Sequence, residues 1–257
     1  MIHSTQRPKP SPPAATAAHI CLQNGRALYL GPGLKLQPHR NSVATLVIGM
    51  DHHFELSRHA TGLKEFEHRR LAVIAPNTLH HLRRTTGTMA FLYLDALGDD
   101  WASLNEPSLD TQALAVTNML NEAFQSPPAQ WLDAALEALS ISPKPRHLRR
   151  LSATVRAIDR APQHFARVET AAKHARLSVS RFQHVFRAEM GMPFRRYRLW
   201  RRMAIVAAQI AAGHSLTHAA HEAGFASSAH LSSTFKEMFG LPPSALVATG
   251  MHLVQGH

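Results

Sequence analysis

The sequence predicts an α+β protein with a β-rich N-terminal domain and an all-helical C-terminal domain. Short apolar or alternating segments, separated by Gly, Pro, Asn and Asp, occupy residues 19–95. From about residue 99 the apolar residues recur instead at helical spacing. A helical pattern in residues 178–193 then returns in residues 227–242, an offset of 49 residues. The chain of 257 residues is long enough for one large or two modest domains with a buried core.

Charge and composition indicate which partners the chain can bind and which classes of protein it does not belong to. Residues 1–143 hold 11 Lys/Arg and 12 Asp/Glu, a net charge of −1, whereas residues 144–257 hold 17 and 5, a net charge of +12. This asymmetry indicates a polyanionic partner for the C-terminal part, either nucleic acid or an anionic membrane. No apolar run is long enough to span a bilayer, so we expect that the chain has no membrane-spanning segment. The lone cysteine excludes an intrachain disulfide framework and favours a cytoplasmic location.

The N-terminal domain is expected to be an antiparallel barrel or sandwich. A Pro-, Ser- and Ala-rich tail, residues 1–18, is expected to be disordered. Residues 19–98 then contain five runs of strand length, at 26–30, 42–50, 53–57, 70–76 and 89–95.

Amphipathic helices are predicted next, at 111–124 and 130–140, within a helical segment 99–141 that packs on the sheet or pairs with another subunit. The Pro-containing segment 142–146 is the predicted linker, and residues 147–250 form the predicted C-terminal domain.

The internal repeat predicts two helix-turn-helix units. Ser178 aligns with Ser227 at a position suited to a helix N-cap, and Gly191 aligns with Gly240 at a helix end. An Ala-rich segment precedes each copy, at 168–175 and 216–223, so each unit reads as short helix, tight turn and second helix. Gly224 supplies the conformational freedom that the second turn needs.

A helix at 194–213 is predicted to join the two units at a fixed separation. Two recognition helices held this way can enter successive major grooves, about 34 Å apart on one face of DNA. Arginines crowd the start of the joining helix, where they are placed to bind phosphates: Arg195, Arg196, Arg198, Arg201 and Arg202.

Residues 147–246 resemble the DNA-binding domain of the AraC/XylS family of bacterial transcription regulators. The resemblance rests on the double helix-turn-helix and on a signature in the second unit, carried here by Ala220, Gly224-Phe225, Ser227, Leu231 and Phe235-Lys236. Tyr197, Arg202, Ile210 and the Gly-x-Pro endings also match. Leu231, Ser233, Gln209 and Ala219 depart from the residues usual in the family.

The polar faces of the two second helices supply the candidate DNA-binding residues. Arg pairs well with guanine and Gln with adenine, so the first unit is expected to read bases more directly than the Ser-rich second unit. Phe182, Phe186, Leu231 and Phe235 are expected in the core. In addition to Arg195, Arg196, Arg201 and Arg202, the predicted DNA-binding set is Ser178, Ser180, Arg181, Gln183, His184, Arg187, Ser227, Ser228, His230, Ser232, Ser233 and Lys236.

The strand-rich region resembles the cupin-like effector-binding and dimerisation domain common in this family. The resemblance implies a small-molecule pocket inside the barrel, with His39, Phe54, His80 and Phe91 as candidate effector-binding residues. Asn41 stands where a metal cupin has its second histidine ligand. The segment 51–59 offers an alternative cluster with His52, His53, Glu55 and His59, but strand alternation places His53 and Glu55 on one face and His52 on the other. We expect no metal and no cofactor.

The leading hypothesis is a sequence-specific transcription regulator that binds double-stranded DNA and a small effector. RNA polymerase and a second copy of the chain are further candidate partners. No catalytic Ser-His-Asp, Cys-His, Walker-type or paired-carboxylate constellation is recognisable, so we expect no enzyme. Two alternatives stay open: a cupin-type metalloenzyme with an accessory nucleic-acid-binding module, and a constitutive architectural DNA-binding protein.

Overall fold

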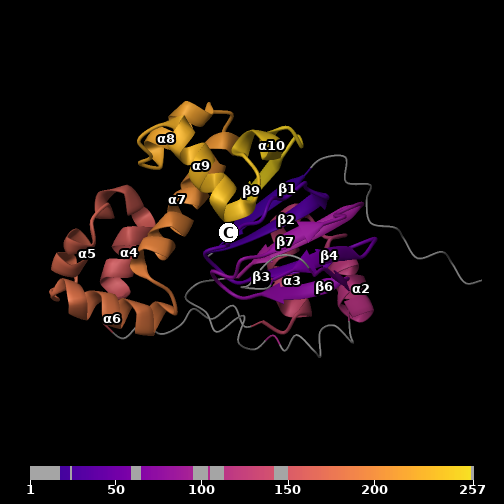
Figure 1. Cartoon of the computed structure of the whole chain (residues 1–257), viewed down its shortest axis with the longest axis horizontal. Helices are drawn as coiled ribbons and strands as arrows, with labels where there is room; N and C mark the ends of the chain where they lie inside the picture. Colours follow the sequence, from indigo (N-terminus) through magenta and orange to yellow (C-terminus); the bar gives the residue numbers. More distant parts are fainter. Residues whose placement is uncertain are drawn as a thin grey trace, which may run out of the picture.

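The N-terminal region folds into two β-sheets, and one strand from the C-terminal end adds to the edge of the larger sheet (Figure 1). The computed structural model describes residues 18–23, 25–58, 65–94, 104, 113–141 and 150–255, so the predicted linker 142–146 and nearly all of the predicted tail lie outside the described residues. The larger sheet has the order β6-β3-β8-β2-β1-β9 and the smaller one the order β5-β4-β7. The strands are β1 (His19–Gln23), β2 (Arg26–Pro32), β3 (Thr45–Gly49), β4 (Phe54–Ser57), β5 (Glu67–Arg69), β6 (Leu71–Ile74), β7 (His81–Arg83), β8 (Thr88–Tyr93) and β9 (His252–Gln255).

The expected fold class, a β-rich domain followed by helices, is confirmed, whereas the strands described do not close into a barrel. The larger sheet ends at β6 on one side and at β9 on the other. The chain crosses between the sheets repeatedly, because β4, β5 and β7 belong to the smaller sheet while β3, β6 and β8 belong to the larger one. An isolated bridge between His39 and His80 lies outside both sheets. The arrangement is therefore a sandwich of two sheets.

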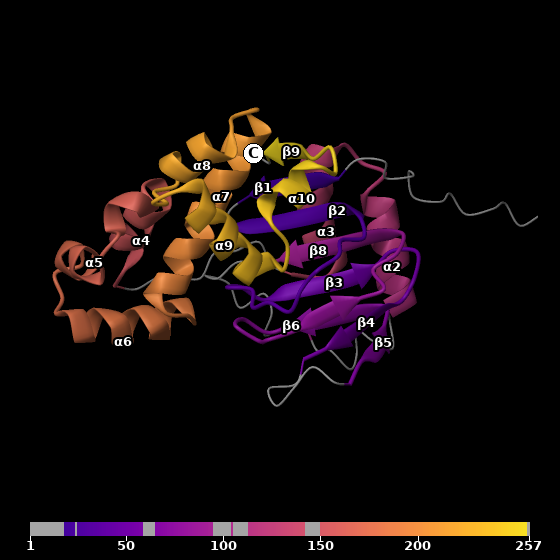
Figure 2. The same cartoon turned by 45° about the horizontal axis from the view of Figure 1, so that its top comes forward.

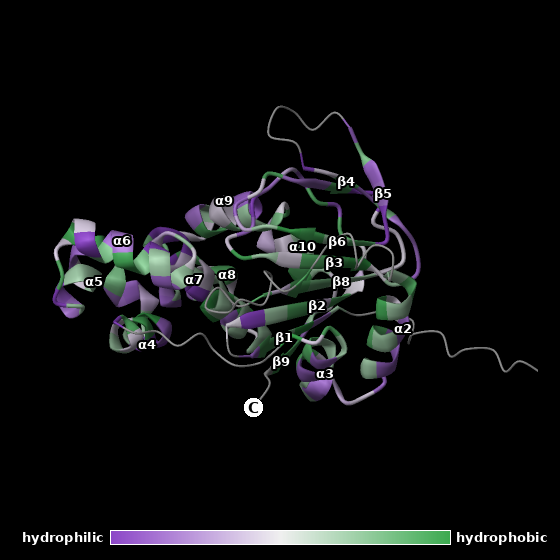
Figure 3. Ribbon diagram, turned by 90° about the horizontal axis from the view of Figure 1, so that it is seen from below, coloured by the Kyte–Doolittle hydropathy of each residue, from purple (hydrophilic) through white to green (hydrophobic). Residues whose placement is uncertain are grey.

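Alternation along the strands gives the larger sheet two buried faces. In β8, Met89 and Phe91 point into a core shared with the smaller sheet and the C-terminal helices, whereas Ala90 and Leu92 point into a second core. Burial on both faces explains why these strands read as nearly continuous apolar runs in the sequence (Figure 3).

Two helices cover the second face of the larger sheet: α2 (Ala113–Ala123) and α3 (Trp131–Ala138), joined through the short 3-10 helix η1 (Pro128–Gln130). Leu120 of α2 and Trp131 and Leu132 of α3 are buried in this core. The predicted amphipathic stripes therefore pack on the sheet. Leu114 and Met119 of α2 face solvent, with 62% and 44% of their surface exposed.

The C-terminal region is helical up to residue 247 and contains both predicted helix-turn-helix units (Figure 1). The first unit is α5–α6, the second is α8–α9, and α7 joins them. The elements are α4 (Ser152–Arg160), η2 (Pro162–Phe165), α5 (Val168–His174), α6 (Val179–Met190), α7 (Phe194–Ala211), α8 (Leu216–Glu222), α9 (Ser228–Phe239) and α10 (Pro243–Val247). None of the described helices is both long and apolar enough to cross a membrane.

The local signals at the helix ends behave as predicted. The hydroxyl of Ser178 accepts a hydrogen bond from the amide of Arg181, and that of Ser227 accepts one from His230. Gly191 and Gly240 end α6 and α9 in the left-handed conformation, with φ of 70° and 77°. Gly224 has φ of 72° after α8, as the turn requires.

The second helix-turn-helix unit rests on the β-sheets, whereas the first projects away from them (Figures 1 and 2). The indole of Trp200 in α7 donates a hydrogen bond to the carbonyl of Gly25 at 2.9 Å. At the end of α9, the carbonyl of Gly240 accepts from the amide of Gln37 at 2.7 Å. Strand β9, which the sequence reasoning did not predict, pairs in parallel with β1. The two regions are therefore bound together by backbone as well as side-chain contacts.

Candidate DNA-binding surface and interdomain cavity

Helix α6 presents the first predicted set of base-reading side chains. Its apolar residues Phe182, Val185 and Phe186 are buried, and α6 packs against α5 and α7. This burial turns the opposite face to solvent, where Arg181, Gln183 and His184 are exposed. Ser180 and Arg187 are exposed on the same helix. The amphipathic pattern thus fixes which side of α6 is available to a DNA groove.

Helix α9 presents a shorter and less charged set. Leu231, Phe235 and Met238 are buried, which leaves His230, Ser233 and Lys236 exposed and Ser228 and Ser232 half-buried. The ring of His230 packs edge-on against Phe225 at 5.4 Å, so part of that side chain is already engaged within the unit. Serine hydroxyls discriminate bases less well than a bidentate Arg or Gln.

Arg202, predicted to bind a phosphate, is buried and has a structural role. Only 6% of its surface is exposed. Its Nε donates a hydrogen bond to the carbonyl of Ala223 at 2.6 Å, and its guanidinium lies 3.6 Å from the centre of the Phe225 ring. Burial, followed by the charge of Arg198, lowers the pKa of Arg202 to about 10. The prediction of a DNA contact for Arg202 is therefore wrong: the side chain holds α7 to the end of α8.

Arg201, also predicted to bind a phosphate, pairs with a carboxylate of helix α4. Its Nε lies 2.9 Å from a carboxylate oxygen of Asp159 in α4, and only 21% of the Arg201 side chain is exposed. The hydroxyl of Tyr197 donates to the same carboxylate. Burial raises the pKa of Asp159, although Arg201 and Tyr197 act in the opposite direction. Arg201 therefore joins α7 to α4 rather than facing DNA.

A cationic cleft of about 530 Å³ lies beside α6, between the start of α5 and the start of α7. Gln183, Arg187, Arg195 and Arg198 are among the residues that line it. Arg198 is one of the arginines at the start of α7 that the sequence places near phosphates. Burial, and then the like charge of Arg195, lowers its pKa. The signal was present in the sequence, because Arg195 and Arg198 are three residues apart on one helix and hence on one face. Arg196 is half-buried nearby.

A second cavity, of about 420 Å³, lies between the β domain and the helical domain. Strands β1, β2 and β8 provide apolar walls through Ile20, Leu22 and Phe91, and the helices provide Met203, Phe239 and Leu246. Three charged residues also contribute to the lining: Arg26, Asp159 and Arg201. The cavity is therefore mainly apolar with two cations and one carboxylate, and it belongs to both domains.

Of the four predicted effector-binding residues, only Phe91 lines this cavity. Phe54 is fully buried in the core between the sheets. His39 and His80 pack against each other with ring centres 4.1 Å apart, and their Nδ1 atoms lie 2.8 and 2.9 Å from the carbonyls of Gln37 and Thr78. Burial lowers the pKa of His39 to about 3 and that of His80 to about 4. His39, Phe54 and His80 therefore do not line this cavity: Phe54 packs between the sheets, and the two histidines pair with each other outside the strands.

Comparisons with known proteins agree with this architecture. The family model of a helix-turn-helix domain matches residues 171–249, which span both units and the helix between them. The chain therefore carries a helix-turn-helix domain of the AraC type. It is a DNA-binding transcription regulator.

Solved structures of ToxT from Vibrio cholerae are similar in fold to most of this chain. An apo ToxT variant superposes with a TM-score of 0.58 at 11% identity, covering 88% of this chain and 98% of ToxT. ToxT bound to (E)-4-(8-methylnaphthalen-1-yl)but-3-enoic acid superposes with a TM-score of 0.53 at 11% identity, covering 87% and 98%. At such identity the likeness concerns the fold. A comparison with curated proteins found no match.

The buried AraC signature positions of this chain are structural. Ala220, Leu231 and Phe235 are buried between α8, α9 and α7, and Arg202 anchors the unit as described above. Of the four departures, Gln209 is half-buried and Ser233 is exposed, whereas Ala219 and Leu231 are fully buried. The apolar part of the signature is thus packing, whereas its polar members Ser227 and Lys236 are exposed.

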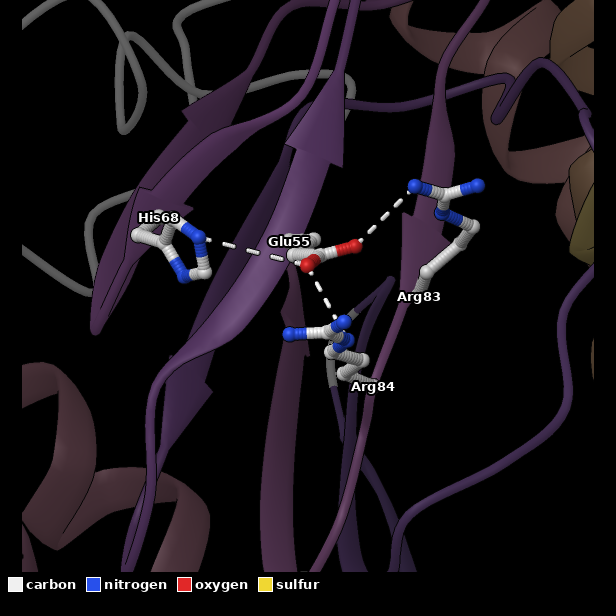
Figure 4. A network of polar contacts seen from close by, with 4 residues as sticks. All are labelled: Glu55, His68, Arg83 and Arg84. Atoms are coloured by element: carbon white, nitrogen blue, oxygen red, sulfur yellow. Dashed lines mark hydrogen bonds and ion pairs between the residues drawn. The ribbon is translucent and has the colours of Figure 1, made fainter.

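The smaller sheet accounts for the cluster considered as an alternative metal site (Figure 4). The nearly buried carboxylate of Glu55 in β4 pairs with Arg83 and Arg84, each at 3.1 Å, and lies 4.0 Å from a ring nitrogen of His68. Arginine side chains thus pair with both of its oxygens. Within the described residues no three His, Cys, Asp or Glu side chains converge as metal ligands, and His59 lies outside them.

Proposed function

We propose that this regulator binds a specific operator through both helix-turn-helix units and that a small effector in the interdomain cavity controls its affinity for DNA. One observation carries the proposal. The cavity is lined by α7 and α9, the joining helix and the second recognition helix, as well as by β1, β2 and β8. A molecule bound there touches the elements that position the DNA-binding surface.

The first unit is assigned most of the base reading. Arg181, Gln183 and His184 are exposed on α6, and Arg and Gln can each make two hydrogen bonds to a base edge. The cationic cleft beside α6 is assigned to the DNA backbone. Arg187, Arg195 and Arg198 have no carboxylate partner in the described structure, and a phosphate would offset the cost of crowding these charges.

The second unit is assigned a smaller share of sequence reading. His230, Ser233 and Lys236 face solvent, so α9 is available to the next major groove. Its serines give it few bidentate contacts, so we assign it mainly affinity and orientation.

The proposed effector is an apolar molecule with one anionic group. Apolar walls dominate the cavity, and the cations Arg26 and Arg201 outnumber Asp159 among its charged residues. A ToxT structure holds an aromatic carboxylic acid, which supports testing this chemical class first.

The ion pair between Arg201 and Asp159 offers a physical route from cavity to DNA. Asp159 belongs to α4, which packs on α7 and η2 next to the first unit. An anionic group that pairs with Arg201 competes with Asp159, and a carboxylate left buried without its partner is unfavourable. Effector binding would therefore shift the balance between arrangements of α4 and α7.

The test begins with selection of bound duplexes from a random library, without ligand and with a panel of apolar monocarboxylic acids. The proposal expects one enriched motif and an acid that changes the affinity for it. The change should be lost in Arg201→Gln and kept in Arg196→Gln, a neighbour on α7 that does not line the cavity. An acid response that survives Arg201→Gln unchanged would remove Arg201 from the mechanism. A library without enrichment would favour the architectural alternative.

A further inference from the structure

The last described strand belongs to the sheet of the other domain. Strand β9 follows α10 after a short turn and pairs in parallel with β1, placing His252, Leu253, Val254 and Gln255 opposite residues 19–22. The amide of His252 donates to the carbonyl of Ala18 at 2.8 Å. A parallel pair cannot be joined by a tight hairpin, so this pairing links segments far apart in the chain. β9 thereby ties the second helix-turn-helix unit to the N-terminal sheet.

The side chains of β9 pack on both faces of the larger sheet, which stabilises the pairing of β9 with β1. Leu253 packs on the core that the helical domain shares with the sheets, and Val254 packs on the core under α2 and α3. The ring of His252 stacks on that of His19 with centres 5.4 Å apart. Yet β9 is short and lies at the edge of the sheet, so it is among the elements that can open locally without unfolding the domain.

The docked strand also borders the interdomain cavity. Ile20 and Leu22 of β1 line the cavity, and their register partners on β9 are Leu253 and Gln255. Leu246, in the helix that leads into β9, lines it as well. A ligand that moves β1 or α10 therefore acts directly on the pairing of β9.

We propose that β9 is an autoinhibitory strap that holds the second helix-turn-helix unit on the β domain and is released when the protein engages DNA. The first unit projects freely, whereas the second is held by β9, by Trp200 and by the end of α9 (Figure 2). DNA with two successive grooves sets one relative position for the two units, and the pairing of β9 with β1 limits how far the second unit can move toward it. The inference rests on the proposed function, because the cavity beside β1 provides the site that controls the strap.

The register offers a cross-link that tests the strap. Cys21 of β1 is opposite Val254, and both side chains pack on the same core. Paired strands lie about 4.8 Å apart, within the range that a disulfide spans. In Val254→Cys, diamide should take two electrons and two protons from the two thiols and leave a disulfide that locks β9 in place. Burial raises the pKa of Cys21 to about 12, so residue 254 supplies the attacking thiolate.

The locked protein should bind its selected operator about tenfold more weakly than the same variant after reduction. Val254→Ser and the wild-type protein, treated with diamide in the same way, should show no change. A chain that ends at Met251 should bind several-fold more tightly than one lacking only residues 256 and 257. Circular dichroism checks that all variants are folded.

Two results would overturn the proposal that β9 acts as a strap. One is failure of the disulfide to form, because it would mean that β1 and β9 are not paired. The other is equal operator affinity of the locked and reduced forms. Hydrogen exchange of the α8 and α9 amides should slow on locking and quicken on truncation. This readout needs no DNA, so a protein without operator selectivity would refute the proposed function while the strap is still tested.

Discussion

The two glycines that end the recognition helices provide a matched pair of substitutions at the interface between the domains. Gly191 and Gly240 are equivalent in the repeat, and both are left-handed, with φ of 70° and 77°. A Cβ on Gly191 would meet nothing within 4 Å, whereas one on Gly240 would lie 2.5 Å from the carbonyl oxygen of Gln37 and 2.6 Å from Nδ1 of His39. Gly240→Ala therefore probes the interdomain contact, and Gly191→Ala is its control.

The two substitutions should differ in how much they lower the free energy of unfolding, because they share some costs and not others. Both incur the same left-handed strain of about 1–2 kcal/mol and the same entropic effect on the unfolded chain. Only Gly240→Ala forces backbone atoms apart, at about 1–3 kcal/mol for overpacking, and weakens the hydrogen bond from the Gln37 amide, at about 1 kcal/mol. Gly240→Ala should thus lower the free energy of unfolding by about 2–4 kcal/mol more than Gly191→Ala.

Urea denaturation of the two variants and the wild type measures this difference directly. Hydrogen exchange should locate the change at residues 37–40 and 237–240 in Gly240→Ala and leave those amides unchanged in Gly191→Ala. Equal destabilisation by the two substitutions would refute the reasoning, since it would mean that the end of α9 does not contact the β domain.

Three further predictions concern single side chains. Arg202→Gln should lower the free energy of unfolding by about 2–3 kcal/mol, because it leaves the Ala223 carbonyl poorly satisfied, and should leave the salt dependence of DNA binding unchanged. Arg198→Gln should weaken binding to all sequences alike and reduce the slope of log affinity against log salt by about 1, as salt titrations would show. His80 has a folded pKa of about 4, below the value of about 6.5 in the unfolded chain, so the unfolded state gains the proton first and stability falls as pH drops below about 6.5. Between pH 7.5 and pH 5, His80→Gln should lose about 2 kcal/mol less stability than the wild type in denaturation series.

The features that depend on neighbouring residues, namely helix caps and turns, could be predicted from the sequence. Ser178 and Ser227 cap helices because a hydroxyl before an apolar stripe satisfies free amides, and Gly224 turns the chain because it has no Cβ. The repeat made these signals mutually supporting, so the helical domain was predictable nearly element by element.

Features that depend on contacts between distant parts of the chain could not be predicted from the sequence. Nothing in the residues around 252–255 indicates that β1 is their partner, and strand phase alone could not tell that Phe91, but not His39 or His80, faces the cavity. Arg201 and Arg202 sit among neighbouring arginines in the sequence, yet their positions on α7 turn them inward to Asp159 and Ala223. Charge composition predicted a basic surface, whereas only packing shows which cations belong to it.

Competition binding at one fixed salt concentration measures sequence-specific recognition through α6. The selected operator and a scrambled duplex of equal length and composition would compete for the wild-type protein and for Arg181→Ala. The wild type should prefer the operator by about 10³-fold or more, and Arg181→Ala should lose about 1–3 kcal/mol of that preference at one base pair while its affinity for the scrambled duplex stays nearly the same. Equal competition by both duplexes, or a uniform loss in Arg181→Ala, would contradict sequence-specific recognition through α6.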